Sequence, residues 1–133
     1  NNLPKNVEYT QNPTSDELVS IYNRADIFIF PSHTEGWGLT PLEAMACQCA
    51  VVGTRTGFVL DIGKAEENML ICEPGDIEGL ADNIYRLCVD GDLRRRLAEN
   101  GCRDIRKLTW DNSSIKLCGL LEDYICGEEK NEN

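Results

Sequence analysis

The chain has 133 residues, of which 41% are hydrophobic and 27% charged, a composition typical of one globular domain. A formal net charge of −10 disfavours nucleic acid and anionic lipid as partners, and no apolar run has membrane-spanning length. The chain has seven cysteines without a Cys-x-x-Cys pair, and His33 is its single histidine. This pattern argues against a disulfide framework and against a zinc site. It favours reduced, mostly buried thiols in a cytosolic protein.

The first predicted elements are a strand, a helix and a second strand. Val7 to Thr10 has a strand-like pattern. Thr14 to Glu17 forms a capping box, and the helix that follows should bury one stripe of side chains: Leu18, Ile21, Tyr22 and Ala25. Ile27 to Phe30 is apolar on both faces, which predicts a central parallel strand covered by helices.

Residues 35 to 43 carry the strongest local signal, Glu-Gly-Trp-Gly-Leu-Thr-Pro-Leu-Glu. Thr40 is predicted at a helix N-cap, with Pro41 at the first helical position and Glu43 at N3, as in a capping box. The free N–H groups and the positive dipole end of such a helix favour phosphate. Gly36 and Gly38 would let the main chain approach a ligand that a Cβ would obstruct.

The rest of the chain continues the alternation of strands and helices. Strands are expected at Ala50 to Gly53 and Met69 to Cys72. Asp76 should cap a helix whose apolar stripe comprises Ile77, Leu80, Ala81, Ile84, Leu87 and Cys88. A further helix should run from about Asp92 to Lys107 with Arg94, Arg95 and Arg96 on a solvated face, and a last one from about Asp111 to Ile125 should bury Leu117, Leu120, Leu121 and Tyr124.

This alternation predicts an α/β fold, a doubly wound and mostly parallel Rossmann-like sheet with helices on both faces. Ligands of such sheets bind beyond the carboxyl ends of the strands. The segment from Ser32 to Leu39 leaves the carboxyl end of the most apolar strand. The predicted phosphate-binding helix start therefore falls where the fold would place a ligand.

Several motifs in order resemble the donor-binding, C-terminal domain of retaining GT-B glycosyltransferases that use nucleotide sugars and carry a Glu-x7-Glu motif. The similarity covers roughly residues 7 to 112. It rests on Tyr22 to Ser32, on Glu35 to Leu39 with Leu42 to Ala46, and on Val51-Val52, Thr54, Gly57, Asp61, Pro74-Gly75-Asp76 and Thr109-Trp110.

The resemblance implies a role for each matching residue. Glu35 would be the catalytic residue, contacting the transferred sugar near its anomeric carbon, and Glu43 would bind the ribose of the nucleotide. The backbone of Gly36, Trp37, Gly38, Leu39 and Thr40 would bind the sugar and diphosphate. No cofactor or metal is implied, since a fixed helix N-terminus stabilises the departing diphosphate, and one preorganised donor is worth about 3 kcal/mol.

Four positions depart from the family pattern, namely Gln48, Ala50, Phe58 and Asp61. Gln48 stands where glycine usually ends the helix, and a non-glycine residue in a left-handed cap costs about 1 kcal/mol or more, which leaves open a turn of another shape. The departures leave the identity of the sugar open.

Residues 1–126 are interpreted as the donor-binding domain and 127–133 as a disordered acidic tail. The start without methionine suggests a piece of a longer protein that lacks the first strands of this domain. The family's basic diphosphate clamp and acceptor domain would lie upstream, so this chain alone should bind donor weakly and turn nothing over. The full-length protein would be cytoplasmic, with peripheral association at the inner face of the membrane, and would glycosylate a glycan or lipid-linked acceptor.

The sequence also allows other interpretations. Glu43 could only close its capping box, Glu35 could be a solvated loop carboxylate, and Trp37 could only pack the loop. The domain could be a noncatalytic receiver-like interaction module, although its strand ends lack a cluster of aspartates. Glu35 and Glu43 could also be the acid and nucleophile of a glycoside hydrolase, whose carboxyl groups lie about 5 to 9 Å apart.

Overall fold

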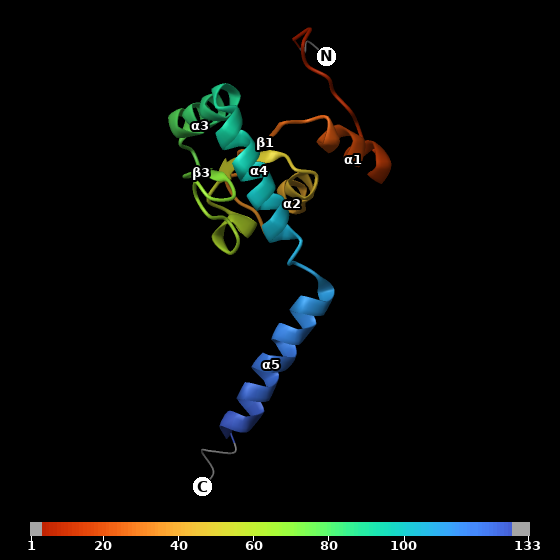
Figure 1. The fold of residues 1–133 in the computed structure, drawn as a ribbon, viewed down its shortest axis with the longest axis vertical. Helices are drawn as coiled ribbons and strands as arrows, with labels where there is room; N and C mark the ends of the chain where they lie inside the picture. Colours follow the sequence, from red (N-terminus) through yellow and green to blue (C-terminus); the bar gives the residue numbers. More distant parts are fainter. Residues whose placement is uncertain (1–3, 129–133) are drawn as a thin grey trace.

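The computed structural model describes residues 4–128 and contains a parallel sheet in the order β1-β2-β3 with helices around it (Figure 1). The strands are β1 (Ile27–Phe30), β2 (Ala50–Thr54) and β3 (Leu70–Cys72). The helices are α1 (Ser15–Asn23), α2 (Leu39–Ala46), the 3-10 turn η1 (Gly57–Leu60), α3 (Ile77–Val89), α4 (Gly91–Ile105) and α5 (Trp110–Glu128). The predicted α/β class is confirmed.

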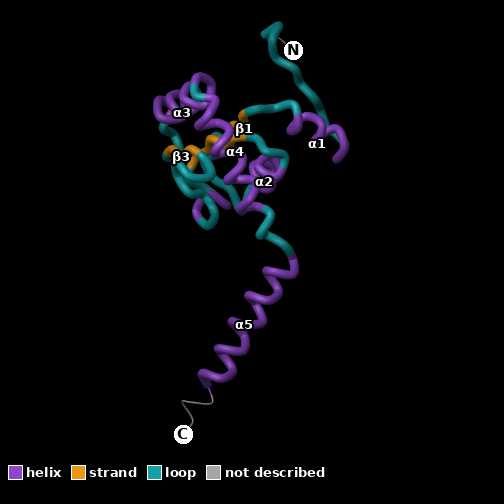
Figure 2. The backbone as a smooth tube through the Cα atoms, viewed as in Figure 1, coloured by secondary structure: helices purple, strands orange, loops and turns teal. Residues whose placement is uncertain are grey.

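Strand β2 lies at the centre of the sheet and separates two apolar clusters. Val51 packs on one face with residues of α2 and η1, while Ala50 and Val52 pack on the other with residues of α3 and α4. Alternate side chains of a strand point to opposite faces, so both faces of β2 are covered. Figure 2 shows the short strands surrounded by α2, α3 and α4.

The prediction that Ile27 to Phe30 is the central strand is wrong, because β1 pairs only with β2 among the described residues. Phe28 and Phe30 pack against the cluster that includes α2. Ile29, on the opposite face, is 44% exposed because α3 and α4 lie over β2 and β3 instead. Two apolar faces therefore did not distinguish a central strand from an edge strand.

At the amino-terminal end, one prediction holds and one fails. Thr14 caps α1, and the capping box with Glu17 is complete in both directions. Residues 7 to 10 form no strand, and Val7 and Tyr9 are exposed. A strand-like pattern of four residues forms no strand without a neighbouring strand to pair with.

Helix α5 projects away from the rest of the molecule (Figure 1). Its predicted apolar stripe is not buried, because no other described element packs on it: Leu117, Leu120, Leu121 and Tyr124 are all more than half exposed. No helix in residues 4–128 is both long enough and apolar enough to span a membrane. Of the acidic tail expected at 127–133, residues 127 and 128 end α5, and residues 129–133 lie outside the described part of the chain.

The carboxyl-terminal end of α2 is a Schellman motif built around Gln48, whose φ is +62°. The Gln48 N–H donates to the Met45 carbonyl at 3.0 Å, and the Cys49 N–H donates to the Ala44 carbonyl at 2.9 Å. The turn therefore keeps the left-handed shape that glycine usually provides, and the alternative shape considered for Gln48 is wrong. The two recovered hydrogen bonds offset the strain of the non-glycine residue.

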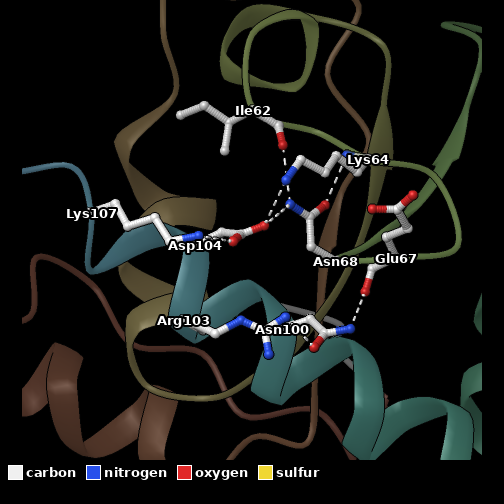
Figure 3. Close-up of polar contacts among 8 residues, drawn as sticks. All are labelled: Ile62, Lys64, Glu67, Asn68, Asn100, Arg103, Asp104 and Lys107. Atoms are coloured by element: carbon white, nitrogen blue, oxygen red, sulfur yellow. Dashed lines mark hydrogen bonds and ion pairs between the residues drawn. The ribbon is translucent and has the colours of Figure 1, made fainter.

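A polar network anchors the connection between η1 and β3 to α4 (Figure 3). Asn68 is 1% exposed. It accepts from the Lys64 N–H at 2.8 Å and donates to the Ile62 carbonyl at 3.0 Å and to Asp104 on α4 at 3.2 Å. Asp104 also pairs with Lys64 and Lys107 at 3.2 and 2.8 Å. The carboxylate thus joins the irregular connection to a regular helix.

The arginine run on α4 is more than the solvated face that was predicted. Arg94 donates to the Leu87 carbonyl at 2.7 Å, and Arg96 donates to the Glu66 carbonyl at 2.8 Å. Arg95 and Arg96 are exposed as predicted, and Arg95 forms an ion pair with Asp92 at 3.4 Å. Two of the three arginines therefore hold neighbouring segments on α4.

The predicted burial of apolar and thiol side chains is met in part. On α3, Leu87 is fully buried and Leu80 and Ile84 are partly buried, whereas Ile77 is 78% exposed. The cysteines with described side chains are free thiols: Cys49, Cys72 and Cys102 are buried, Cys47 is half-buried, and Cys88 and Cys118 are exposed. The two exposed thiols lie on the outer faces of α3 and α5, which no other described element covers.

Candidate functional site

The loops that follow the three strands meet at the carboxyl edge of the sheet. The Thr54 hydroxyl, at the end of β2, donates to the Ser32 carbonyl just after β1. The Arg55 N–H donates to the Cys72 carbonyl at the end of β3 at 2.9 Å, and the Arg55 side chain pairs with Glu73 at 2.7 Å. These contacts fix the loop of residues 31–38 beside the loops that follow β2 and β3.

Residues 35 to 38 are packed closely against η1. The Phe58 N–H donates to the Trp37 carbonyl at 2.7 Å. Gly57 has a φ of +54°, and a Cβ at this position would lie 2.5 Å from the same carbonyl oxygen and 3.0 Å from the Glu35 Cβ. Only a glycine leaves room for this approach. Glu35 itself is exposed, and nothing would lie within 4 Å of a Cβ on Gly36, so this side of the loop is open.

Helix α2 begins earlier than predicted. Gly38 is the N-cap, with a φ of +86° and a ψ of +84°, and Leu39 is the first helical residue. The predictions for this helix start are therefore wrong: Thr40 is not the N-cap, Pro41 is not at N1, and Glu43 closes no capping box. The left-handed backbone of Gly38 turns the chain into the helix two residues sooner. Pro41 falls in the first turn, where its missing N–H breaks no intrahelical bond.

The start of α2 lacks the side-chain cap that the other α-helices have. Thr14, Asp76, Asp90 and Thr109 accept from the first turns of α1, α3, α4 and α5. Gly38 has no side chain to do this, and within residues 4–128 no hydrogen bond engages the N–H groups of Gly38, Leu39 and Thr40. Leu39 and Thr40 are exposed. Three donors at the positive end of a helix dipole are therefore available to an anion.

Glu43 lies on the exposed side of α2, one turn beyond these donors. Its Oε2 accepts from the Tyr22 hydroxyl of α1 at 3.2 Å. The sequence placed Tyr22 only on an apolar stripe. A tyrosine among buried positions usually needs a hydroxyl partner, and that is the signal which could have revealed the contact.

The structure thus brings Glu35 and the backbone of Gly36 to Thr40 to the carboxyl edge of the sheet, where the sequence predicted a ligand site. A separate hollow of about 600 Å³ lies at the opposite edge, where β1 and β2 begin. It is lined by Asn23, Ala25, Asp26, Ala46, Cys47, Gln48, Gly91, Arg94, Arg95, Ala98 and Glu99. Because ligands of open parallel sheets bind at the carboxyl ends of the strands, the carboxyl edge is the candidate site.

Comparison with known sequences places the chain in a family of glycosyltransferases. The family described as Glycosyl transferases group 1 matches residues 1–104. The chain is 38% identical over 111 residues to a D-inositol 3-phosphate glycosyltransferase of Corynebacterium jeikeium, covering 81% of this chain and 26% of that protein. It is 34% identical over 98 residues to the capsular polysaccharide biosynthesis glycosyltransferase CapM of Staphylococcus aureus, covering 69% of this chain and 26% of that protein.

Solved structures agree with the sequence comparison. The C-terminal domain of a glycosyl transferase group 1 family protein from Francisella tularensis superposes with a TM-score of 0.70 at 36% identity, covering 75% of this chain and 51% of that chain. The fold is thus that of the C-terminal domains of GT-B glycosyltransferases. The chain spans about a quarter of the length of the two curated relatives described above, 26% in each case.

Proposed function

Because the chain belongs to the Glycosyl transferases group 1 family, we propose that it is the nucleotide-sugar donor-binding domain of a retaining glycosyltransferase. The full-length enzyme would move a hexosyl group from a nucleoside diphosphate sugar to a glycan or lipid-linked acceptor. The observation that carries this proposal is the uncapped start of α2, with free N–H groups at Gly38, Leu39 and Thr40.

The proposed reaction breaks the bond between the anomeric carbon and the diphosphate. Negative charge then develops on the departing phosphate oxygens, and positive charge develops on the sugar. The amide groups at the start of α2 are fixed by the fold, so they would stabilise the leaving group without reorganisation and without a metal. The Arg55 guanidinium also lies at this edge, but it is paired with Glu73 at 2.7 Å.

The two glutamates would have separate roles. Glu35, in the open loop before Gly36, would contact hydroxyl groups of the transferred sugar and tolerate its developing positive charge. Glu43, farther along α2, would accept hydrogen bonds from the ribose. The acceptor would bind to a domain outside these 133 residues, with the full-length enzyme in the cytoplasm at the inner face of the membrane. One relative, CapM of Staphylococcus aureus, is named for capsular polysaccharide biosynthesis, which supports a glycan product.

The two alternative functions are less well supported. An interaction module gives no reason for glycine at the N-cap of α2 or for an open Glu35. A glycoside hydrolase would leave the free amide groups of α2 without a use, because no phosphate departs in that reaction. Family membership also favours transfer over hydrolysis.

Binding of nucleoside diphosphates by the chain tests this proposal. Ligand-observed NMR with UDP, GDP, ADP and free sugars should show weak binding of at least one nucleoside diphosphate. Glu43→Ala should weaken it about ten- to hundredfold, because a hydrogen bond to a charged group contributes about 1.5 to 3 kcal/mol. Glu122→Ala, an exposed change on α5, is the matched control and should have no effect. Binding of oligosaccharides with no nucleotide binding would favour the hydrolase instead.

A further inference from the structure

The contact between Tyr22 and Glu43 joins a buried side chain to a proposed ligand-binding one. Tyr22 is 5% exposed, near the end of α1, and Glu43 is exposed on α2. The tyrosine hydroxyl donates to Glu43 Oε2 at 3.2 Å across 21 residues of sequence. Within residues 4–128 no hydrogen bond engages the other carboxylate oxygen, Oε1.

The apolar core fixes the position of the Tyr22 ring. The ring meets Phe28 of β1 edge-on, with centroids 5.8 Å apart and an interplanar angle of 70°. It also belongs to a buried cluster with Ala44 of α2 and Cys49. The Cys49 thiol donates to the Tyr22 carbonyl at 3.2 Å, so backbone and ring are both held. The core therefore fixes the position from which the Tyr22 hydroxyl donates to Glu43.

We propose that Tyr22 is a positioning residue for nucleotide recognition: it holds one oxygen of the Glu43 carboxylate and leaves the other free to accept from the ribose hydroxyls. This inference rests on the proposed function, because it assumes that Glu43 binds the ribose. A glutamate on an exposed helix face otherwise has several rotatable bonds, and ordering it costs entropy on binding. Tyr22 lowers that cost before the ligand arrives.

The surroundings keep Tyr22 in the donor form. Burial, together with the negative charge of Glu43 and the hydrogen bond to it, raises the pKa of the Tyr22 hydroxyl to about 12. The hydroxyl is therefore protonated at any pH at which binding would be measured. The hydrogen bond runs in one direction, from tyrosine to carboxylate.

The test compares a ribonucleotide with a ligand that lacks the ribose hydroxyls. Tyr22→Phe keeps the ring and removes the donor. With UDP as the probe, or GDP where UDP does not bind, Tyr22→Phe should weaken binding about three- to tenfold, the effect of one hydrogen bond. The 2′,3′-dideoxy form of the same nucleotide should bind the wild-type chain and Tyr22→Phe equally. Tyr85→Phe, at an exposed tyrosine of α3, should change neither affinity.

A second readout needs no substitution at Tyr22. The ζ-carbon signal of Tyr22, observed by NMR in the wild-type chain, should shift with the ribonucleotide and not with the dideoxynucleotide. This keeps the test informative even where Tyr22→Phe lowers stability.

The outcomes separate this inference from the proposed function. If Glu43→Ala weakens ribonucleotide binding and Tyr22→Phe does not, the positioning role is wrong while the proposed function stands. Equal weakening of ribo- and dideoxynucleotide binding by Tyr22→Phe would mean a structural role only, and would also overturn the inference. If no nucleotide binds, or Glu43→Ala has no effect, the ribose assignment fails and the positioning role fails with it.

Discussion

Replacing Gly57 with alanine is expected to destabilise the chain by about 3 kcal/mol, because the new Cβ would meet two penalties at once. The residue has a φ of +54°, a region that disfavours alanine. The Cβ would also lie 2.5 Å from the Trp37 carbonyl oxygen, which already accepts from the Phe58 N–H at 2.7 Å. The backbone would have to move, because the nearest atoms, the Trp37 carbonyl oxygen and the Glu35 Cβ, do not lie at the end of a flexible side chain.

Urea denaturation followed by circular dichroism measures this effect. Gly36→Ala is the matched control in the same loop and should stay within about 0.5 kcal/mol of the wild type, because nothing lies within 4 Å of its Cβ position. Gly57→Ala should also weaken nucleotide binding, because Gly57 abuts Glu35 and Trp37. Equal midpoints for the two variants would show that η1 does not hold the candidate site loop as described.

Asp104→Ala is expected to cost about 2 kcal/mol at pH 7 and almost nothing near pH 2. Asp104 pairs with Lys107, Asn68 and Lys64, and these partners lower the pKa of its carboxyl from 3.8 to about 2. The Asp104 side chain is only 13% exposed, whereas the side chains of Lys64 and Lys107 are 55% and 66% exposed, so solvent screens the two ion pairs in part. The irregular connection between η1 and β3 depends on this carboxylate for its attachment to α4.

The sign of the pH dependence follows from the lowered pKa. The folded state binds the Asp104 proton less readily than the unfolded chain, so the stabilisation is complete above the ordinary pKa of 3.8 and is lost as the pH falls toward about 2. Denaturation of wild type and Asp104→Ala at several pH values between 2 and 7 measures the difference. Asp92→Ala, whose side chain is 94% exposed, should cost under about 0.5 kcal/mol at every pH. A loss of unfolding free energy in Asp104→Ala that does not change with pH would contradict the described ion pairs.

The elements that the sequence predicted correctly depend on short-range rules. Thr14 and Asp76 cap helices because their side chains bond to amides three residues away. The strand at Ala50 and the position of the loop after Phe30 at the carboxyl edge of the sheet also follow from local patterns and from the rule for parallel sheets. The location of the candidate site was therefore predictable.

The errors concern information that a local pattern does not contain. The helix start at Leu39 depends on the backbone angles of Gly38, which the capping pattern at Thr40 could not reveal. The apolar stripe of α5 can be buried only where another element packs on it, and an amphipathic pattern does not show whether such an element is present. The contact of Tyr22 with Glu43 joins residues far apart in sequence.

The most direct test of the proposed diphosphate site is an amide NMR titration of the 133-residue chain with inorganic pyrophosphate and with a nucleoside diphosphate. Both ligands should shift the N–H signals of Gly36, Gly38, Leu39 and Thr40, because these groups are proposed to face the phosphates. Only the nucleotide should also shift signals around Glu43. Unchanged signals at residues 36–40, or shifts confined to the hollow near Asp26, Gln48 and Arg94, would contradict the account.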